Sequence, residues 1–114
     1  MMAYVPKRGD IVWLDFNLQT GREQEGRRPA LVITPDVYNG KTQLMVCCPI
    51  KSKVKGYPFE VLLPSEFPVK GVILADQVKS LDWARRRAEF KAQVPDKVLS
   101  ETLQKLAALL SFED

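Results

Sequence analysis

Short apolar runs separated by turn-forming residues occupy roughly the first 80 positions of the chain. Valine, isoleucine, leucine and tryptophan dominate the runs, and glycine, proline and asparagine lie between them, which is typical of short antiparallel strands. We expect strands at Asp10 to Phe16, Pro29 to Thr34, Thr42 to Pro49, Pro58 to Leu63 and Gly71 to Leu81. Because such strands hide their edges by closing or stacking, the pattern predicts a small barrel or sandwich.

The C-terminal end has a different periodicity, in which leucines recur at intervals of four, three and four residues. These positions are Leu99, Leu103, Leu106 and Leu110, with Ala107 on the same stripe. Pro95 suits the first turn of a helix, and Asp96 and Lys105 have the charges that favour its two ends. The spacing therefore predicts an amphipathic helix of about 15 residues whose leucine stripe packs as core.

Composition supports one soluble domain that covers residues 1–114. A 12.9 kDa chain is long enough for a single core, and 46% hydrophobic with 27% charged residues is typical of a globular rather than a disordered protein. Met1 to Asp10 contains no continuous apolar run, and no segment approaches the roughly 18 apolar residues of a membrane helix. We expect a cytoplasmic protein without membrane contact.

The chain contains 0 histidines, which removes several classes of chemistry. Ser-His-Asp and Cys-His arrangements, ribonuclease sites with paired histidines and all histidine-containing zinc sites are excluded. Catalysis by this chain has to use carboxylates, arginine, lysine, hydroxyl groups or backbone dipoles, and we expect neither metal nor cofactor.

The two cysteines, Cys47 and Cys48, are neighbours in an apolar run. Adjacent side chains on a strand point to opposite faces, so these two thiols are poorly placed to bond each other. The chain has no Cys-x-x-Cys pair for metal or redox chemistry. We expect buried, reduced thiols, and an intermolecular disulfide is the alternative.

The cations form tight groups, although the net charge is only 17 − 14 = +3. The groups are Arg22, Arg27 and Arg28 in a glycine-rich loop, Lys51, Lys53 and Lys55 after a strand, and Arg85 to Arg87 in a run. Two loops that meet at one end of an antiparallel barrel form a cationic groove for a phosphate backbone. The simpler interpretations are lysines that protect an edge strand and arginines neutralised by Asp82 and Glu89.

Carboxylates and guanidinium groups lie side by side in the segment from Gly21 to Pro29. A carboxylate there can act as a base, while an arginine holds a phosphate and stabilises the charge that develops on it. RNA supplies its own nucleophile, the 2′-hydroxyl, so this chemistry needs no metal. The same spacing equally fits ion pairs without chemistry.

Four segments, taken together and in order, carry a family resemblance: Gly9 to Trp13, Glu23 to Ile33, Lys55 to Val61 and Ala75 to Leu81. They resemble the MazF/PemK family of bacterial toxins from type II toxin–antitoxin systems, and the similarity runs from about Tyr4 through the C-terminal helix. The resemblance implies an SH3-like antiparallel barrel with a C-terminal helix. It also implies a cytoplasmic homodimer that is neutralised by a cognate MazE-like antitoxin with an extended acidic tail.

The activity that the resemblance implies is that of an mRNA interferase, a sequence-specific endoribonuclease that cuts single-stranded mRNA without metal or ribosome. Arg28, before Pro29, looks like the family's catalytic arginine, and Glu23, before Gln24, looks like its catalytic carboxylate. Gln77, after Asp76, corresponds to the family's RNA groove. The remaining candidates for RNA contact are the cations Arg27, Lys53 and Lys55.

Lys51 departs from the family pattern, because it stands where the catalytic threonine is expected, with Ser52 at the second hydroxyl position. Lysine is a long cation without an acceptor, whereas threonine is a compact neutral donor and acceptor. Three accounts remain open: Lys51 obstructs the phosphate and attenuates cleavage, Lys51 supplies charge stabilisation, or Ser52 takes over the hydroxyl role. We favour the first.

Two further classes of function compete with a ribonuclease. One is a barrel that binds RNA without cutting it, which Lys51 favours. The other is a toxin that grips a protein, as the CcdB gyrase poisons do, although the Glu-Gln and Arg-Pro pairs resemble the ribonuclease branch.

Overall fold

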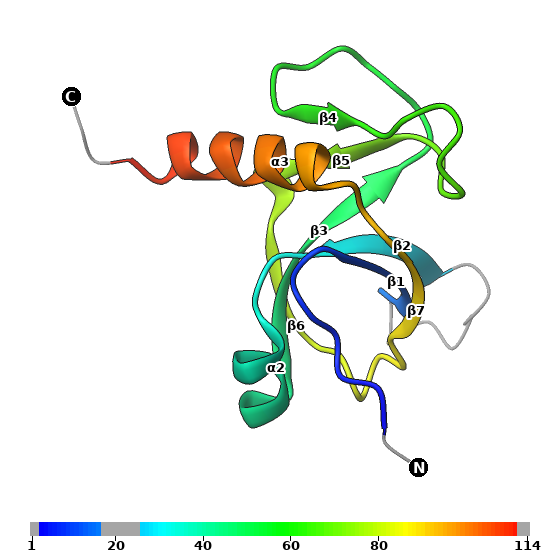
Figure 1. Ribbon diagram of the computed structural model, residues 1–114, viewed down its shortest axis with the longest axis vertical. Coiled ribbons are helices and arrows are strands. Elements are labelled where there is room, and N and C mark those ends of the chain that lie inside the picture. Colours follow the sequence, from blue (N-terminus) through cyan, green and yellow to red (C-terminus); the bar gives the residue numbers. More distant parts are fainter. Residues whose placement is uncertain (1–2, 17–25, 112–114) are drawn as a thin grey trace.

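The fold is an antiparallel sheet with a short helix in one connection and a longer helix at the C-terminus (Figure 1). This computed structural model describes residues 3–16 and 26–111. The strands are β1 (Asp10–Asp15), β2 (Arg27–Val32), β3 (Leu44–Lys51), β4 (Glu60–Leu62), β5 (Val72–Leu74), β6 (Lys79–Asp82) and β7 (Glu89–Gln93). The helices are α2 (Asp36–Thr42), the 3-10 turn η1 (Ala75–Gln77) and α3 (Asp96–Leu109).

β3 is the central strand, because it pairs with three others. One edge pairs with β2, where Leu31 faces Cys48. The opposite edge pairs first with β6, from Leu44 to Cys47, and then with β5, from Ile50 to Lys51. The change of partner falls at Cys48 and Pro49, and proline has no N–H to donate to a ladder. The sheet therefore divides at Pro49 into a part that contains β6 and a part that contains β5.

This division corrects the predicted strand from Gly71 to Leu81. The segment forms two strands, β5 and β6, with η1 between them, because each strand pairs with a different half of β3. The strands predicted at 10–16, 29–34, 42–49 and 58–63 are confirmed, with shifted ends. Two elements were missed: α2 lies in a predicted loop, and β7 is a mostly exposed edge strand without apolar alternation.

The prediction of a closed barrel is not confirmed. The sheet runs in the order β4-β5-β3-β2-β1-β7, with β6 also on β3, and among the described residues β4 and β7 do not pair with each other. The secure description is a mainly antiparallel sheet with a C-terminal helix. Within the same residues, no helix is long and apolar enough to cross a membrane.

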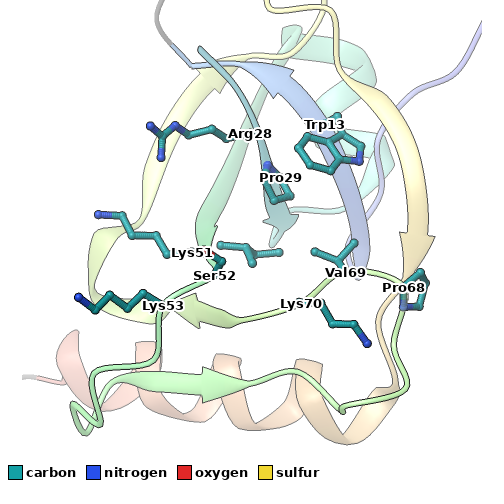
Figure 2. Close-up of a pocket in the computed structure, with 10 residues that line it drawn as sticks. Trp13, Arg28, Pro29, Lys51, Ser52, Lys53, Pro68, Val69 and Lys70 are labelled. Carbon is teal, nitrogen blue, oxygen red and sulfur yellow. The ribbon is translucent and has the colours of Figure 1, made fainter. Parts of the chain in front are cut away.

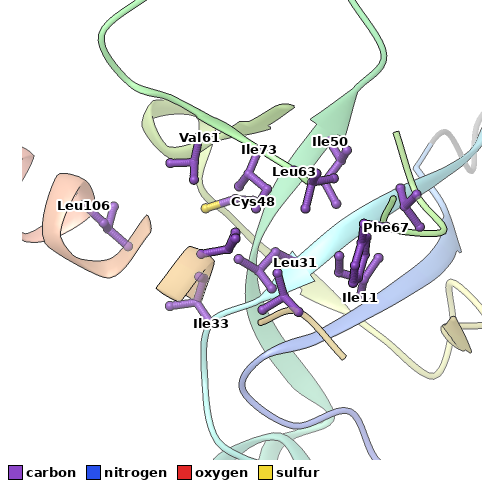
Figure 3. Close-up of a cluster of buried hydrophobic side chains, with 13 residues drawn as sticks. Ile11, Leu31, Ile33, Cys48, Ile50, Val61, Leu63, Phe67, Ile73 and Leu106 are labelled. Atoms are coloured by element: carbon purple, nitrogen blue, oxygen red, sulfur yellow. The ribbon is translucent and has the colours of Figure 1, made fainter. Parts of the chain in front are cut away.

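Two apolar clusters lie on opposite faces of β3, and the cysteines separate between them. Cys48 packs in the cluster that includes Leu31, Ile73 and Leu106 (Figure 3). Cys47 packs in the other cluster, and both thiols are buried, as predicted. Burial raises the pKa of each thiol to about 12, so both are protonated at neutral pH.

The predicted C-terminal helix is confirmed as α3, but its buried face differs from the leucine stripe. Val98, Thr102 and Leu106 are buried, whereas Leu99 and Leu103 are only partly buried. Leu110 is 64% exposed, because the helix extends past the sheet (Figure 1). Lys105 Nζ donates to Glu60 O at 2.9 Å and ties α3 to β4.

Asn39 connects four segments through one buried side chain and its own backbone. Its Nδ2 donates to Pro6 O at 2.8 Å and to Thr34 O at 2.9 Å, and its Oδ1 accepts from Thr34 Oγ1 at 2.7 Å. The Asn39 carbonyl accepts from Trp83 Nε1 at 2.9 Å. Asn39 is 0% exposed, so loss of its amide leaves buried carbonyls without donors.

We therefore expect Asn39→Ala to lower the free energy of unfolding by about 3 kcal/mol, the effect of a small cavity and several lost buried hydrogen bonds. Urea unfolding followed by circular dichroism measures the change. Lys41→Ala, at an exposed position of the same helix, is the matched control and should shift stability by less than about 0.5 kcal/mol. Equal stability of the two variants contradicts this assignment.

Candidate functional site

Arg28 and Lys51 lie on two neighbouring strands, Arg28 near the start of β2 and Lys51 at the end of β3. β2 and β3 pair with Ala30 opposite Pro49, and extending this register by two residues sets Arg28 opposite Lys51. Both side chains are exposed. Figure 2 shows Arg28, Lys51 and Lys53 extending to the same side. Two segments that are distant in the sequence thus present their cations together.

Three hollows in the surface meet at Lys51. The first, of about 420 Å³, is lined by Trp13, Arg28, Pro29, Ile50, Lys51, Ser52, Lys53, Pro68, Val69 and Lys70. The second, of about 210 Å³, is lined by Phe16, Arg28, Pro49, Ile50, Lys51, Gln77 and Lys79. The third, of about 320 Å³, is lined by Lys51, Lys53, Lys55, Tyr57, Glu60, Leu74, Asp76 and Gln77. Together they form a cationic surface with an aromatic side chain in each hollow.

Most of the site residues predicted from the sequence line this surface. They are Arg28, Lys51, Ser52, Lys53, Lys55, Asp76 and Gln77. Glu23 lies outside the described residues. The segment that carries it leaves from Phe16 and returns at Gly26, and Phe16 N donates to Gly26 O at 2.8 Å. The two ends of that segment therefore lie together beside Arg28.

Arg27 lies apart from the three hollows, in an ion-pair cluster around Asp15. Its Nη1 donates to Asp15 Oδ1 at 3.0 Å, and its Nη2 contacts Glu89 Oε1 at 3.2 Å. Arg87 Nε donates to Asp15 Oδ2 at 2.8 Å. The hydrogen bond from Arg87 holds the pKa of the Asp15 carboxyl below its usual range, despite the opposing effect of burial, and Arg27 adds to the lowering.

Two of the three arginines in the run from 85 to 87, Arg86 and Arg87, make structural contacts, and their partners are not the expected Asp82 and Glu89. Arg87 pairs with Asp15, and Arg86 Nη1 donates to Phe16 O at 2.6 Å. Asp82 accepts from the backbone N–H of Arg85 at 2.8 Å, which is the main cause of a lowered Asp82 pKa. These contacts fix the strand ends next to the segment that carries Glu23.

Gly71 is a positioning residue that sequence reasoning missed. A Cβ built on it would lie 2.0 Å from Lys51 O and 2.8 Å from Ser52 Cα, and its φ is +118°. Only glycine permits this close approach and this conformation. The backbone that leads into β5 can therefore lie directly against Lys51, the last residue of β3, and against Ser52, which follows it.

The sequence reading also omitted the walls of the hollows, above all Trp13, Pro68 and Val69. Trp13 is a half-buried position within an otherwise buried strand. A large aromatic residue at a strand position beside the Arg-Pro pair was the available signal. The sequence of residues 68–70 gave no comparable signal, since only the tertiary fold brings this segment to the site.

Comparison with known proteins agrees with the fold. Residues 7–110 match the model of a family described as PemK-like, MazF-like toxins of type II toxin–antitoxin systems. This chain belongs to the PemK/MazF toxin family.

Several relatives are similar over nearly their whole length. The endoribonuclease toxin MazF of Escherichia coli strain K12 is 45% identical over 107 residues, which are 94% of this chain and 96% of the relative. The crystal structure of MazF (Form-I) from Deinococcus radiodurans superposes with a TM-score of 0.86 at 56% identity, over 95% of this chain and 98% of that one. The MazE–MazF structure (Form-II) from the same organism gives 0.87 at 51% identity, over 97% and 100% of the two chains.

The Asp15 cluster predicts a specific dependence of stability on pH. Its contribution is complete above about pH 4, the ordinary carboxyl pKa, and is lost as the pH falls through the lowered pKa of the folded state. Asp15→Asn should therefore cost about 2 kcal/mol at pH 7, and the difference from the unaltered protein should shrink as the pH falls below about 4. Urea midpoints across this range test it, with the exposed Glu66→Gln as control. A difference that stays constant with pH contradicts the prediction.

Proposed function

We propose that this chain is a toxin that cuts single-stranded mRNA at specific sequences, without metal or cofactor and independently of the ribosome. The observation that carries the proposal is the meeting of Arg28 from β2 with Lys51, the last residue of β3, and with Ser52, which follows it, in one open hollow. Family membership supports it, as do relatives named endoribonucleases, which include EndoA of Bacillus subtilis at 30% identity over 95% of this chain and 99% of that relative. A cationic, solvent-open surface suits a phosphate backbone.

The chemistry follows from the residue types. The 2′-hydroxyl attacks the adjacent phosphorus, the bond to the 5′ oxygen breaks, and the products are a 2′,3′-cyclic phosphate and a 5′-hydroxyl. Glu23 is the candidate base for the 2′-hydroxyl proton, since its segment leaves and returns beside Arg28. Arg28 stabilises the charge on the phosphoryl oxygens and is the candidate donor to the leaving oxygen.

Lys51 attenuates this reaction in our proposal. Its side chain lines all three hollows, so it occupies the point at which a strand must cross from one to the next. A long cation there displaces the phosphate from Arg28, and an error of about 1 Å can lower the rate about a hundredfold. The alternatives are charge stabilisation by Lys51 itself and a hydroxyl role for Ser52, which lines only the first hollow.

The roles that we propose for the remaining charged and polar side chains depend on whether each one lines a hollow. Lys53, Lys55 and Gln77 line hollows and contact the RNA, the lysines through phosphates. Asp76 repels phosphate and instead accepts from a base edge. The donors of Arg27 engage Asp15 and Glu89, so its contribution to RNA binding is to hold β2 in place.

The binding partners that we propose for this chain are those expected from its family. A MazE-like antitoxin with an acidic tail suits the cationic surface, and MazE–MazF complexes from D. radiodurans at 51% and 55% identity support this pairing. The resemblance to the family also supports a homodimer, an SH3-like barrel architecture and a cytoplasmic location without membrane contact.

An RNA-binding protein without turnover is the second candidate, and Lys51 is the observation that favours it. A gyrase-poison-like binder has less support, because the named relatives are endoribonucleases.

We expect Lys51→Thr to raise the rate of RNA cleavage by about 10- to 100-fold, because a compact hydroxyl replaces a cation beside the phosphate. Both proteins are incubated with a long single-stranded RNA in the presence of EDTA, and the new 5′ ends are mapped. Lys97→Thr, at an exposed position of α3, is the matched control and leaves the rate unchanged. Equal rates contradict the obstruction by Lys51, and absence of cleavage by both forms contradicts the proposed activity.

The mechanism predicts that one 2′-deoxy nucleotide, placed 5′ to the mapped scissile phosphate, blocks cleavage by at least about a thousandfold, because the nucleophile is removed. The same substitution one position away should have little effect. Mass spectrometry of the products from the all-ribose strand should show the cyclic phosphate. Normal cleavage of the deoxy strand excludes the mechanism.

A further inference from the structure

The connection between β3 and β4, residues 52–59, which we call the lysine segment, contains neither helix nor strand (Figure 1). It carries Lys53, Lys55 and Tyr57, which line the third hollow. All three side chains are exposed, so packing against the core does not fix them. A loop that is free before binding costs free energy to order when a ligand binds. The placement of these lysines therefore depends on what holds the backbone of the segment.

A single carboxylate holds that backbone. Glu60, the first residue of β4, accepts from Gly56 N at 2.9 Å through Oε1 and from Lys55 N at 3.2 Å through each oxygen. Gly56 has a φ of +83°, and a left-handed residue lets two successive N–H groups converge on one anion. With the described residues, the backbone of 53–56 forms no other hydrogen bond. The lysine segment is thus attached to the sheet through the Glu60 side chain.

Glu60 is itself fixed by the elements around it. Its backbone pairs with Leu74 of β5, and its carbonyl accepts from Lys105 Nζ of α3 at 2.9 Å. Its N–H donates to Tyr57 O at 3.1 Å, which closes a turn at the end of the segment. The carboxylate therefore reaches the lysine segment from a rigid strand, and a group on a rigid element places its partners more precisely than one on a loop.

The charge of Glu60 and its hydrogen bonds predict opposite effects on RNA binding. The side chain lines the same hollow as Lys53 and Lys55, where a negative charge opposes the binding of phosphates. On charge alone, removal of the carboxylate should strengthen binding. On the hydrogen bonds, its removal should weaken binding, because the lysines lose their placement. The sign of the effect therefore tells the two roles apart.

We propose that Glu60 is a positioning residue for RNA binding, which holds the backbone of Lys55 and Gly56 so that the lysines of this segment meet the phosphates of the strand. The inference rests on the proposed function and adds to it a residue that acts through its neighbours. Lysines placed in advance lose less freedom on binding. This gain exceeds the repulsion from one carboxylate whose charge is already shared by two N–H donors.

Binding is measured with short single-stranded RNA of mixed sequence, made uncleavable by 2′-O-methyl groups, with fluorescence anisotropy as the readout. We expect Glu60→Ala to weaken binding by about 5- to 20-fold, because the RNA must then order the lysine segment. Glu60→Gln, which keeps an oxygen for Gly56 N–H, should stay within about twofold. Glu66→Ala removes an exposed carboxylate from the connection between β4 and β5 and, as the control for charge, should not weaken binding.

A double-mutant cycle tests whether Glu60 acts through the lysines. Lys55→Ala should weaken binding by about 3- to 10-fold in the unaltered protein. In the Glu60→Ala background it should cost less than about twofold, since a lysine that has lost its placement contributes little. Lys79, on β6, lines the second hollow outside the lysine segment, and Lys79→Ala should cost the same in both backgrounds.

The hold on the backbone is also measurable without RNA. The N–H groups of Lys55 and Gly56 should exchange slowly with solvent in the unaltered protein and in Glu60→Gln, and rapidly in Glu60→Ala, as followed by NMR. Glu60→Met replaces Glu60→Ala if the smaller side chain prevents folding, as judged by circular dichroism.

Each outcome supports or overturns the role of Glu60. Tighter binding by Glu60→Ala shows that the carboxylate only repels phosphate. Equal weakening by the alanine and glutamine variants, an undiminished cost of Lys55→Ala in the Glu60→Ala background, or rapid exchange in all the proteins also overturns the proposal. If the unaltered protein binds no strand, the proposed function fails as well, whereas strong binding that is indifferent to Glu60 overturns the positioning role alone.

Discussion

The site depends on the way β3 changes partners at Pro49. Up to Cys47 the strand pairs with β6, and from Ile50 it pairs with β5, while β2 stays on its other edge. A strand can divide its pairing in this way where it lacks a backbone donor. Gly71 completes the junction, since its missing side chain lets β5 approach Lys51 and Ser52. The turn η1 between β5 and β6, which carries Asp76 and Gln77, is a consequence of the same division.

Charged side chains have two roles in this molecule: some form ion pairs that support the strands, and others are exposed. The alternation of side chains along β2 assigns Arg27 and Arg28 to different roles. Arg27 and Arg28 are adjacent on β2 and therefore point to opposite faces. Arg27 is bound to Asp15, together with Arg87, and stabilises the ends of β1 and β2. Arg28 is exposed and extends to the same side of the hollow as Lys51 (Figure 2). The structural cations support the strands, and the exposed ones define the surface that we assign to RNA.

The absence of histidine restricts the way in which such a surface can act on RNA. With no imidazole to move protons at neutral pH, the available groups are the carboxylate of Glu23, the guanidinium of Arg28 and the hydroxyl of Ser52. Lys51 lines the same hollow as Arg28 and Ser52, and its side chain has no hydrogen-bond acceptor. In our proposal the site holds a phosphate, and the rate of cleavage depends on the residue at position 51.

The sequence determined the local structure wherever the signal is local. Alternating apolar runs predicted β1 to β4, and leucine spacing predicted α3, because burial of one face imposes a period of two or of about 3.6 residues. The Arg-Pro pair and the cationic groups predicted most of the residues that line the candidate site, and the roles proposed for them come from the family resemblance. Tertiary structure decided the rest. Only long-range contacts divide residues 71 to 81 between two strands and bring Pro68 and Val69 to the same hollow as Trp13. They also commit Arg27 to Asp15. No sequence period relates the residues that these contacts join.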